Sequence, residues 1–190
     1  MHGKVSVRVV GTLLVLFLFC SESLAQTDAH PIEVGGFLTT IDLRESVGEK
    51  SLGVGGRFSY NFTDNFALDS EVAYFPENPS NNFGQTVALA GLRAGVRSEK
   101  FGAFAKVRPG IVHFGGDAFR ARNGSRSNFA LDVGGVLEFY PSSRVIVRVD
   151  LGDTIVPFGD DVINRPVPPF IFRPGTTHNF QSSFGVGFRL

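Results

Sequence analysis

The chain has 190 residues, enough for one sizeable domain but too few for a barrel followed by a second domain of ordinary size. Its formal net charge is +0, and a chain without a basic excess is not expected to bind nucleic acid. Glycine and phenylalanine are abundant, with 23 and 20 residues, but no stretch after residue 25 has the roughly 18 uninterrupted apolar residues of a membrane helix.

The amino-terminal segment has the pattern of a secretory signal peptide. Lys4 and Arg8 are followed by an apolar run over residues 9–19, and small residues occupy positions 23 and 25, which signal peptidase reads. The pattern predicts that residues 1–25 are cleaved and that residues 26–190 form a single β-barrel domain.

Cys20 is the one cysteine, and cleavage after Ala25 would remove it, so we expect no disulfide in the mature protein. The alternatives to a cleaved signal are a membrane anchor, for which the apolar run is short, and a lipidated Cys20. The residue before a lipidated cysteine is normally small, whereas here it is Phe19.

Beyond residue 26 the sequence divides into eight segments in which apolar and polar residues alternate, as in strands with one apolar face. Gly35-Gly36 obscures the phase of the first segment, and Pro109-Gly110 interrupts the fifth, where we expect a β-bulge. The segments are Ile32–Leu43, Leu52–Phe62, Phe66–Phe75, Thr86–Arg97, Phe101–Phe114, Phe129–Tyr140, Val145–Ile155 and Asn179–Leu190.

The connections between these segments alternate between long and short. This pattern predicts an all-β fold, an eight-stranded antiparallel up-and-down transmembrane β-barrel. The sheet must close on itself because lipid offers no hydrogen-bond partners to an open edge. Short turns and both termini are then periplasmic, and long loops are extracellular. The alternative is a soluble sandwich or lipocalin-like barrel with its apolar face inside. The signal peptide, the loop asymmetry and the last strand favour the membrane barrel.

One hairpin register can be predicted from its turn. If Thr63-Asp64-Asn65 closes the second and third segments, Arg57 falls opposite Glu71 on the polar face, and Tyr60 falls opposite Leu68 on the apolar face. Aromatic residues, Tyr140 among them, flank the short turns, where a membrane barrel has an aromatic girdle.

The end of the last segment resembles the carboxy-terminal signal by which bacterial outer-membrane barrels are recognised for insertion. A polar residue, a glycine two positions later and two large apolar residues stand in the places of that signal: Ser183, Gly185, Phe188 and Leu190. The usual last residue is Phe, so Leu190 departs from the pattern.

By residue-type pattern the mature chain resembles, over essentially its whole length, the small eight-stranded outer-membrane barrels of the OmpA and OmpX kind. The resemblance implies a protein of the outer membrane of a Gram-negative bacterium. It also implies contact with outer-membrane lipid and lipopolysaccharide, and with the barrel-insertion machinery. It concerns architecture and specifies no activity, because one fold hosts many functions.

Charged residues of both signs fall on the polar faces of the predicted strands. An eight-stranded barrel is barely wide enough for side chains, so these charges must pair. Because the signs are interleaved, we expect a plugged lumen in preference to an ion path or proton relay. The predicted lumen charge network comprises Arg57, Asp69, Glu71, Arg93, Arg97, Lys106, Arg108, Asp132, Glu138, Arg148, Asp150 and Arg189.

The candidate catalytic residues are His113 and His178, which fall on strands five and eight, nearly opposite one another. Neither has a His-x-Ser arrangement like that of lipid A deacylases. No cluster has metal-ligand spacing, so we expect no catalytic site, cofactor or metal. The leading hypothesis is a structural or surface-interaction role in adhesion or protection. The alternatives are a surface lipid A acyltransferase or deacylase, and a narrow pore.

The two largest predicted loops differ in chemistry. Gly115–Asn128 carries Arg120, Arg122 and Arg126, whose guanidinium groups suit phosphates and sulfates. We expect it to bind lipopolysaccharide, a surface glycan or a protein, against the alternative of a solvated loop without a ligand. Val156–Thr176 is apolar enough that part of it should extend the last two strands or fold over the barrel mouth.

Overall fold

The computed structural model describes residues 31–42, 50–78, 83–115, 127–157 and 175–190. The predicted signal peptide lies outside these residues, as does most of the two largest predicted loops. No helix in the described part of the chain is long and apolar enough to cross a membrane.

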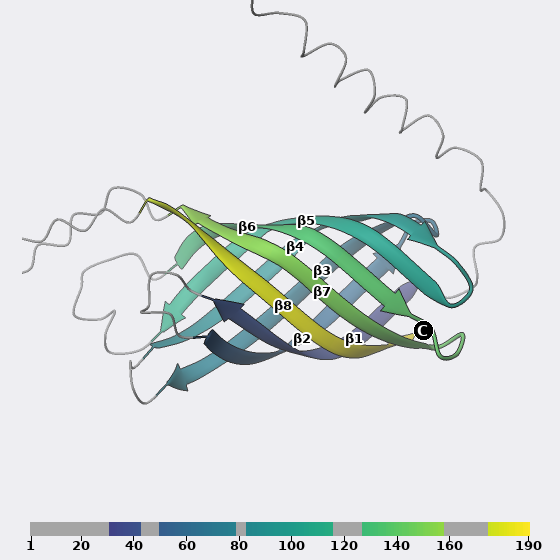
Figure 1. Cartoon of the computed structure of the whole chain (residues 1–190), viewed down its shortest axis with the longest axis horizontal. Coiled ribbons are helices and arrows are strands. Elements are labelled where there is room, and N and C mark those ends of the chain that lie inside the picture. The colour runs from purple at the N-terminus through teal and green to yellow at the C-terminus, as the bar shows by residue number, and fades with distance from the viewer. Residues whose placement is uncertain (1–30, 43–49, 79–82, 116–126, 158–174) are drawn as a thin grey trace, which may run out of the picture.

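The described residues form eight antiparallel strands in one closed barrel, so the predicted fold class is confirmed (Figure 1). Each strand pairs with its neighbours in the chain, and the last strand pairs with the first. The strands are β1 (Ile32–Asp42), β2 (Lys50–Asn61), β3 (Phe66–Asn78), β4 (Phe83–Arg97), β5 (Phe101–Gly115), β6 (Ser127–Phe139), β7 (Val145–Pro157) and β8 (Thr176–Arg189).

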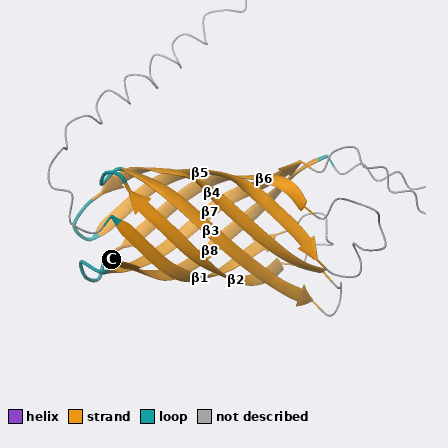
Figure 2. Cartoon of the chain, turned by 180° about the vertical axis from the view of Figure 1, so that it is seen from behind, coloured by secondary structure: helices purple, strands orange, loops and turns teal. Residues whose placement is uncertain are grey.

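Three short turns lie with the carboxyl terminus at one end of the barrel, which we call the short-turn end; the other is the far end (Figure 2). Each turn contains a hydroxyl side chain that accepts a hydrogen bond from the backbone N–H three residues later. These bonds link Phe66 to Thr63, Phe101 to Ser98 and Val145 to Ser142, at 3.1 to 3.2 Å. Serine and threonine favour such local bonds, which end one strand and begin the next.

The predicted register of the first hairpin is confirmed. Arg57 lies opposite Glu71 and Tyr60 opposite Leu68. The backbone N–H of Phe62 donates to the carbonyl of Phe66 at 2.9 Å, which closes the turn in the predicted register.

The predicted β-bulge at Pro109-Gly110 is wrong. Alternation along β5 continues in phase through these residues, and the register with β6 is unbroken. Pro109 has no N–H to donate, and the β4–β5 pairing simply lapses between Leu89–Gly110 and Leu92–Val107, with no residue inserted. The one register irregularity in the described ladders lies instead between Phe75 and Asn78, where β3 pairs with β4.

Several strands reach further towards the far end than their sequence pattern predicts. Val156 and Pro157 continue β7, and β8 begins at Thr176, so the ends of the predicted Val156–Thr176 loop extend these two strands as expected. Residues 158–174 of that loop lie outside the described residues.

The two faces of the barrel wall differ sharply. Outward side chains form an apolar belt in which, for example, Leu52 and Val96 are each 63% exposed. Inward side chains are buried and fall into two layers. Charged residues fill the middle and the short-turn end, and an apolar cluster lies towards the far end.

Candidate functional site: the barrel interior

The middle of the barrel is filled by ion pairs that cross its interior. Arg108 on β5, 0% exposed, contacts three carboxylates: those of Asp69 (2.9 Å), Glu71 (2.8 Å) and Asp132 (2.6 Å). Arg148 on β7 reaches Asp69 on β3, with both terminal guanidinium nitrogens donating to the two carboxylate oxygens at 2.8 to 2.9 Å. This fork-to-fork geometry is the strongest form of a guanidinium–carboxylate contact.

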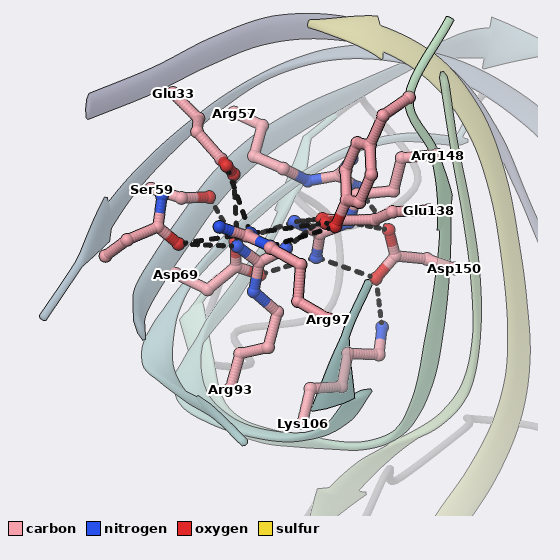
Figure 3. A network of polar contacts seen from close by, with 12 residues as sticks. Glu33, Arg57, Ser59, Asp69, Arg93, Arg97, Lys106, Glu138, Arg148 and Asp150 are labelled. Atoms are coloured by element: carbon pink, nitrogen blue, oxygen red, sulfur yellow. Dashed lines mark hydrogen bonds and ion pairs between the residues drawn. The ribbon is translucent and has the colours of Figure 1, made fainter. Parts of the chain in front are cut away.

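Two further cations complete this middle group (Figure 3). Arg57 contacts Asp150 at 2.7 Å and Glu71 at 3.2 Å. Lys106 lies between Asp150 and Asp132, at 3.1 and 3.0 Å. Each carboxylate therefore serves more than one cation, and the group cannot be divided into independent pairs.

A second group lies nearer the short-turn end. Glu33 on β1 accepts contacts from three arginines, Arg93 (3.0 Å), Arg97 (3.1 Å) and Arg189 (3.1 Å). Arg93 also bonds to Glu138 on β6, and Arg97 lies 3.4 Å from the same carboxylate. The group thus ties β1, β4, β6 and β8 together around the interior.

Tyr140 belongs to this second group, and its predicted place in the outer aromatic girdle is wrong. Its side chain points inward, where the hydroxyl donates to Glu138 at 2.6 Å and accepts from Arg97 at 3.0 Å. Burial raises the pKa of the Tyr140 phenol, and the Glu138 carboxylate raises it further, so the hydroxyl keeps the proton that it donates.

Within the described residues, Glu33 is the one charged member of the interior that the sequence pattern missed. Gly35-Gly36 obscured the phase of the first strand, so the inward side of its early residues was not assigned. Counting in steps of two towards the amino terminus from Phe37 and Thr39, which are both buried, would have placed Glu33 on the inner face.

The structure places all twelve predicted lumen residues inside the barrel and brings each into at least one ion pair. With Glu33, these residues give the interior seven cationic and six anionic side chains. A small cavity of about 20 Å³ lies beside Glu33, Arg57 and Glu138, which is room for roughly one water molecule.

The far part of the interior contains an apolar cluster, a feature that the sequence did not predict, beside buried polar residues such as Thr154, Asn179 and Gln181. Its members are contributed by β1 and by β3 to β7. They are Phe37, Ile41, Ala73, Phe75, Val87, Leu89, Val112, Phe114, Ala130 and Val156. These side chains pack together as in the core of a soluble domain.

The two candidate catalytic histidines face outward and have separate partners. His113 Nδ1 lies 2.8 Å from the Ser127 hydroxyl on β6, and His178 Nδ1 lies 2.5 Å from Asp153 on β7. Within the described residues the structure brings no histidine, carboxylate and serine together as one set. Nor does this part of the chain hold a group of three or more metal-ligating side chains.

The predicted insertion-signal residues lie on the strand that closes the barrel. Ser183 and Gly185 face the interior, whereas Phe188 and Leu190 are outward and more than half exposed. Phe188 pairs with Val34 of β1, and the N–H of Leu190 donates to the carbonyl of Ile32 at 2.9 Å. The predicted polyanion-binding residues Arg120, Arg122 and Arg126 lie outside the described residues.

The fold agrees with comparisons to known proteins. A family described as "Outer membrane protein beta-barrel domain" matches residues 11–189. The chain belongs to this family. It is therefore an outer-membrane β-barrel protein, and the family places it in the bacterial outer membrane. A search of curated protein sequences finds no match.

Solved structures similar to this member of the family share its small barrel. Neisserial surface protein A (NspA) has 16% identity and a TM-score of 0.55 over 86% of this chain and 100% of that one. The N-terminal barrel of Pseudomonas aeruginosa OprF has 14% identity and a TM-score of 0.51 over 84% of this chain and 96% of that one. P. aeruginosa OprG has 12% identity and a TM-score of 0.50 over 85% of this chain and 96% of that one. At these identities the likeness shows the fold alone.

Proposed function

We propose that this outer-membrane protein is a non-enzymatic barrel with a closed interior, which acts at the cell surface through its long connections. The observation that supports it most is the arrangement of the interior charges. Thirteen ionisable side chains of alternating sign interlock across the lumen, whereas ion-selective pores carry rings of one sign. The cavity among them is of the size of a single water molecule.

A narrow pore and a surface lipid-modifying enzyme are the competing functions. A pore would need an open path, but the inward side chains towards the far end are also buried. An apolar cluster lies there beside the hydrogen-bonded Thr154, Asn179 and Gln181. An enzyme acting on a lipid would need a nucleophile, a base and a group that orients the base. The outward pairs His113–Ser127 and His178–Asp153 lie on different strand pairs and do not combine into such a set.

Planar-bilayer recording of the full-length protein tests the closed interior. We expect no stepwise current above that of the lipid alone. As a control for sensitivity, a porin with a water-filled channel, recorded in the same bilayers, should give resolvable steps. Stepwise conduction by the parent protein would favour the pore. Incubation with lipid A, followed by mass spectrometry, should leave the lipid mass unchanged.

The surface role is assigned to the long connections, which on the topology of the family would be extracellular. Surface protease treatment of intact cells should cleave within residues 116–126 or 158–174 and leave the short turns intact. Cleavage at the short turns would reverse the proposed orientation.

The connection that contains Arg120, Arg122 and Arg126 is the proposed contact for a polyanion such as lipopolysaccharide or a sulfated glycan. Replacing the three arginines together by alanine should leave the barrel folded and weaken binding to these polyanions, most clearly at low salt, where charges are least screened. Equal binding by the triple variant and the parent at low ionic strength would remove this ligand from the proposal.

A further inference from the structure

An apolar groove of about 480 Å³ lies on the outer wall of the barrel near the short-turn end. This volume falls in the range of small-molecule sites, roughly 300 to 1,000 Å³. The groove arises where Ala103 on β5 faces outward beside Val96 and Leu137, because its methyl group leaves space that a larger side chain would fill. Its apolar lining includes Val96, Phe101, Ala103, Leu137, Phe139 and Val149.

One end of the groove is bounded by a pair of aromatic rings. Phe101 and Phe139 lie opposite each other across β5 and β6, with ring centroids 5.2 Å apart. Their outward position beside the turns is where a barrel meets the polar boundary of the membrane. The groove therefore runs from the membrane boundary towards the hydrocarbon, as an acyl chain does.

Two exposed cations lie beside this boundary. Lys100 immediately precedes Phe101, and Arg144 immediately precedes β7, which supplies Val149 to the groove. The two turns are neighbours, because the N–H of Tyr140 donates to the carbonyl of Lys100 at 2.9 Å. Neither cation forms an ion pair with any residue that the structure describes.

The charge at these two turns is distinctive on this end of the barrel. Glu99 offsets one of the two cations, so that the turns together carry one net positive charge. The remaining short turn, Thr63-Asp64-Asn65, carries an acid and no cation. An anionic headgroup is thus favoured beside Lys100 and Arg144 and disfavoured beside Asp64.

We propose that this groove is a binding site for one anionic glycerophospholipid of the leaflet that meets the short turns. An acyl chain lies along Ala103, Leu137 and Val149, and the phosphate lies beside Lys100 and Arg144. The site goes beyond the surface role proposed above, and it depends neither on the closed interior nor on the long connections.

The chain contains no tryptophan, so a single introduced indole is a clean reporter. The full-length Phe101→Trp variant is reconstituted in phosphatidylcholine bilayers that contain a small, fixed share of brominated phosphatidylglycerol or, separately, of brominated phosphatidylcholine. Bromine quenches the indole on contact. We expect an association constant about five-fold higher for the anionic lipid, the factor that one basic residue near a membrane surface contributes. Phe139→Trp should report the same preference.

Phe66→Trp is the matched control, because Phe66 follows the acidic turn as Phe101 follows the turn that carries Lys100, and its ratio should be one or below. Adding Lys100→Gln and Arg144→Gln to the Phe101→Trp variant should lower its ratio to the same value. Equal ratios for the Phe101→Trp and Phe66→Trp variants, or a preference that survives loss of both cations, would overturn the site.

The groove itself is tested by filling it. Ala103→Phe should abolish the preference, whereas Ala90→Phe, the same change at an exposed outward position outside the groove, should leave it intact. If the preference for the anionic lipid persists in Ala103→Phe, the cations act without an acyl chain bound in the groove. That result would refute the proposed site. Each variant is first shown to be folded by its faster migration on unheated gels, and Ala103→Leu replaces Ala103→Phe if that variant does not fold.

Discussion

Arg108 is the most completely paired cation that is fully buried in the described interior. Its guanidinium is fully buried and lies within 3 Å of three carboxylates on β3 and β6, with a fourth, that of Asp150, at 3.8 Å. A buried charge is costly when it loses its partner, and removing the arginine would leave the three acids undercompensated. The contribution of Arg108 is therefore best measured as the penalty of its removal.

We predict that Arg108→Met lowers the free energy of unfolding by about 3 to 5 kcal/mol, the usual cost of breaking a buried ion pair from one side. Urea unfolding of the barrel in lipid vesicles measures the change. Lys100→Gln is the control, because this exposed cation has no ion pair among the described residues, and it should shift stability by at most about 0.5 kcal/mol. Similar midpoints for the two variants would show that the interior charges contribute little.

Two adjacent glycines on β6 provide a second residue-scale test. A Cβ at Gly134, on the inner face, would clash with the backbone oxygen of Leu151, whereas at Gly135, on the outer face, the nearest atom is the Phe104 oxygen at 3.7 Å. We predict that Gly134→Ala destabilises the barrel by about 1 to 3 kcal/mol, as overpacking does. Gly135→Ala should be neutral or stabilising by up to about 1 kcal/mol. Comparable urea midpoints for both would contradict the assigned facing.

The two residues that sequence reasoning misplaced, Glu33 and Tyr140, both lie at the ends of alternating segments. The alternation rule assigns a side chain to a face only where its neighbours on the strand fix the phase. Glu33 is separated from the rest of β1 by Gly35-Gly36. Tyr140 continues the inward phase of Glu138 but follows the last residue of β6, and its place beside a turn suggested the aromatic girdle instead. By contrast Arg57 and Glu71 lie in well-patterned strands on either side of a short turn, and their contact was predictable.

At the scale of the strand, the inward or outward direction of a side chain can no longer be predicted where both faces of the strand are apolar. Towards the far end, Phe37 and Leu38 are adjacent, as are Tyr74 and Phe75, and in each pair one side chain points inward and the other outward. Hydrophobicity alone cannot distinguish the two faces there. This explains why the apolar interior layer was not foreseen, although the eight strands and their order were.

β8 is the element on which closure depends. It pairs with β1 over residues 181–189, and Arg189 adds an ion pair to Glu33 at 3.1 Å. We predict that deleting residues 188–190 prevents insertion into the outer membrane but not export, because it leaves an edge of unpaired N–H and C=O groups that lipid cannot satisfy. Fractionation should find the truncated protein in the periplasm. A normal yield in the membrane fraction would contradict this.

At the scale of the whole molecule, a closed sheet should resist detergent until it is heated. We predict that the folded protein migrates faster on unheated than on heated gels, because every strand is paired on both edges.

We also predict that the protein isolated from outer membranes begins at Gln26, which amino-terminal sequencing would establish. An amino terminus at Met1 would contradict the predicted cleavage after Ala25.

The joining of β1 to β8 brings the two ends of the sheet together, since the N–H of Leu190 bonds to the carbonyl of Ile32. A short linker could therefore connect them, and new ends could be opened at Thr63-Asp64-Asn65, as in other circularly permuted domains whose termini lie close together. Such a permutant would keep all eight pairings while moving Ser183–Leu190 to the interior of the sequence. Its behaviour in cells would separate what barrel closure requires from what the insertion machinery reads at the end of the chain.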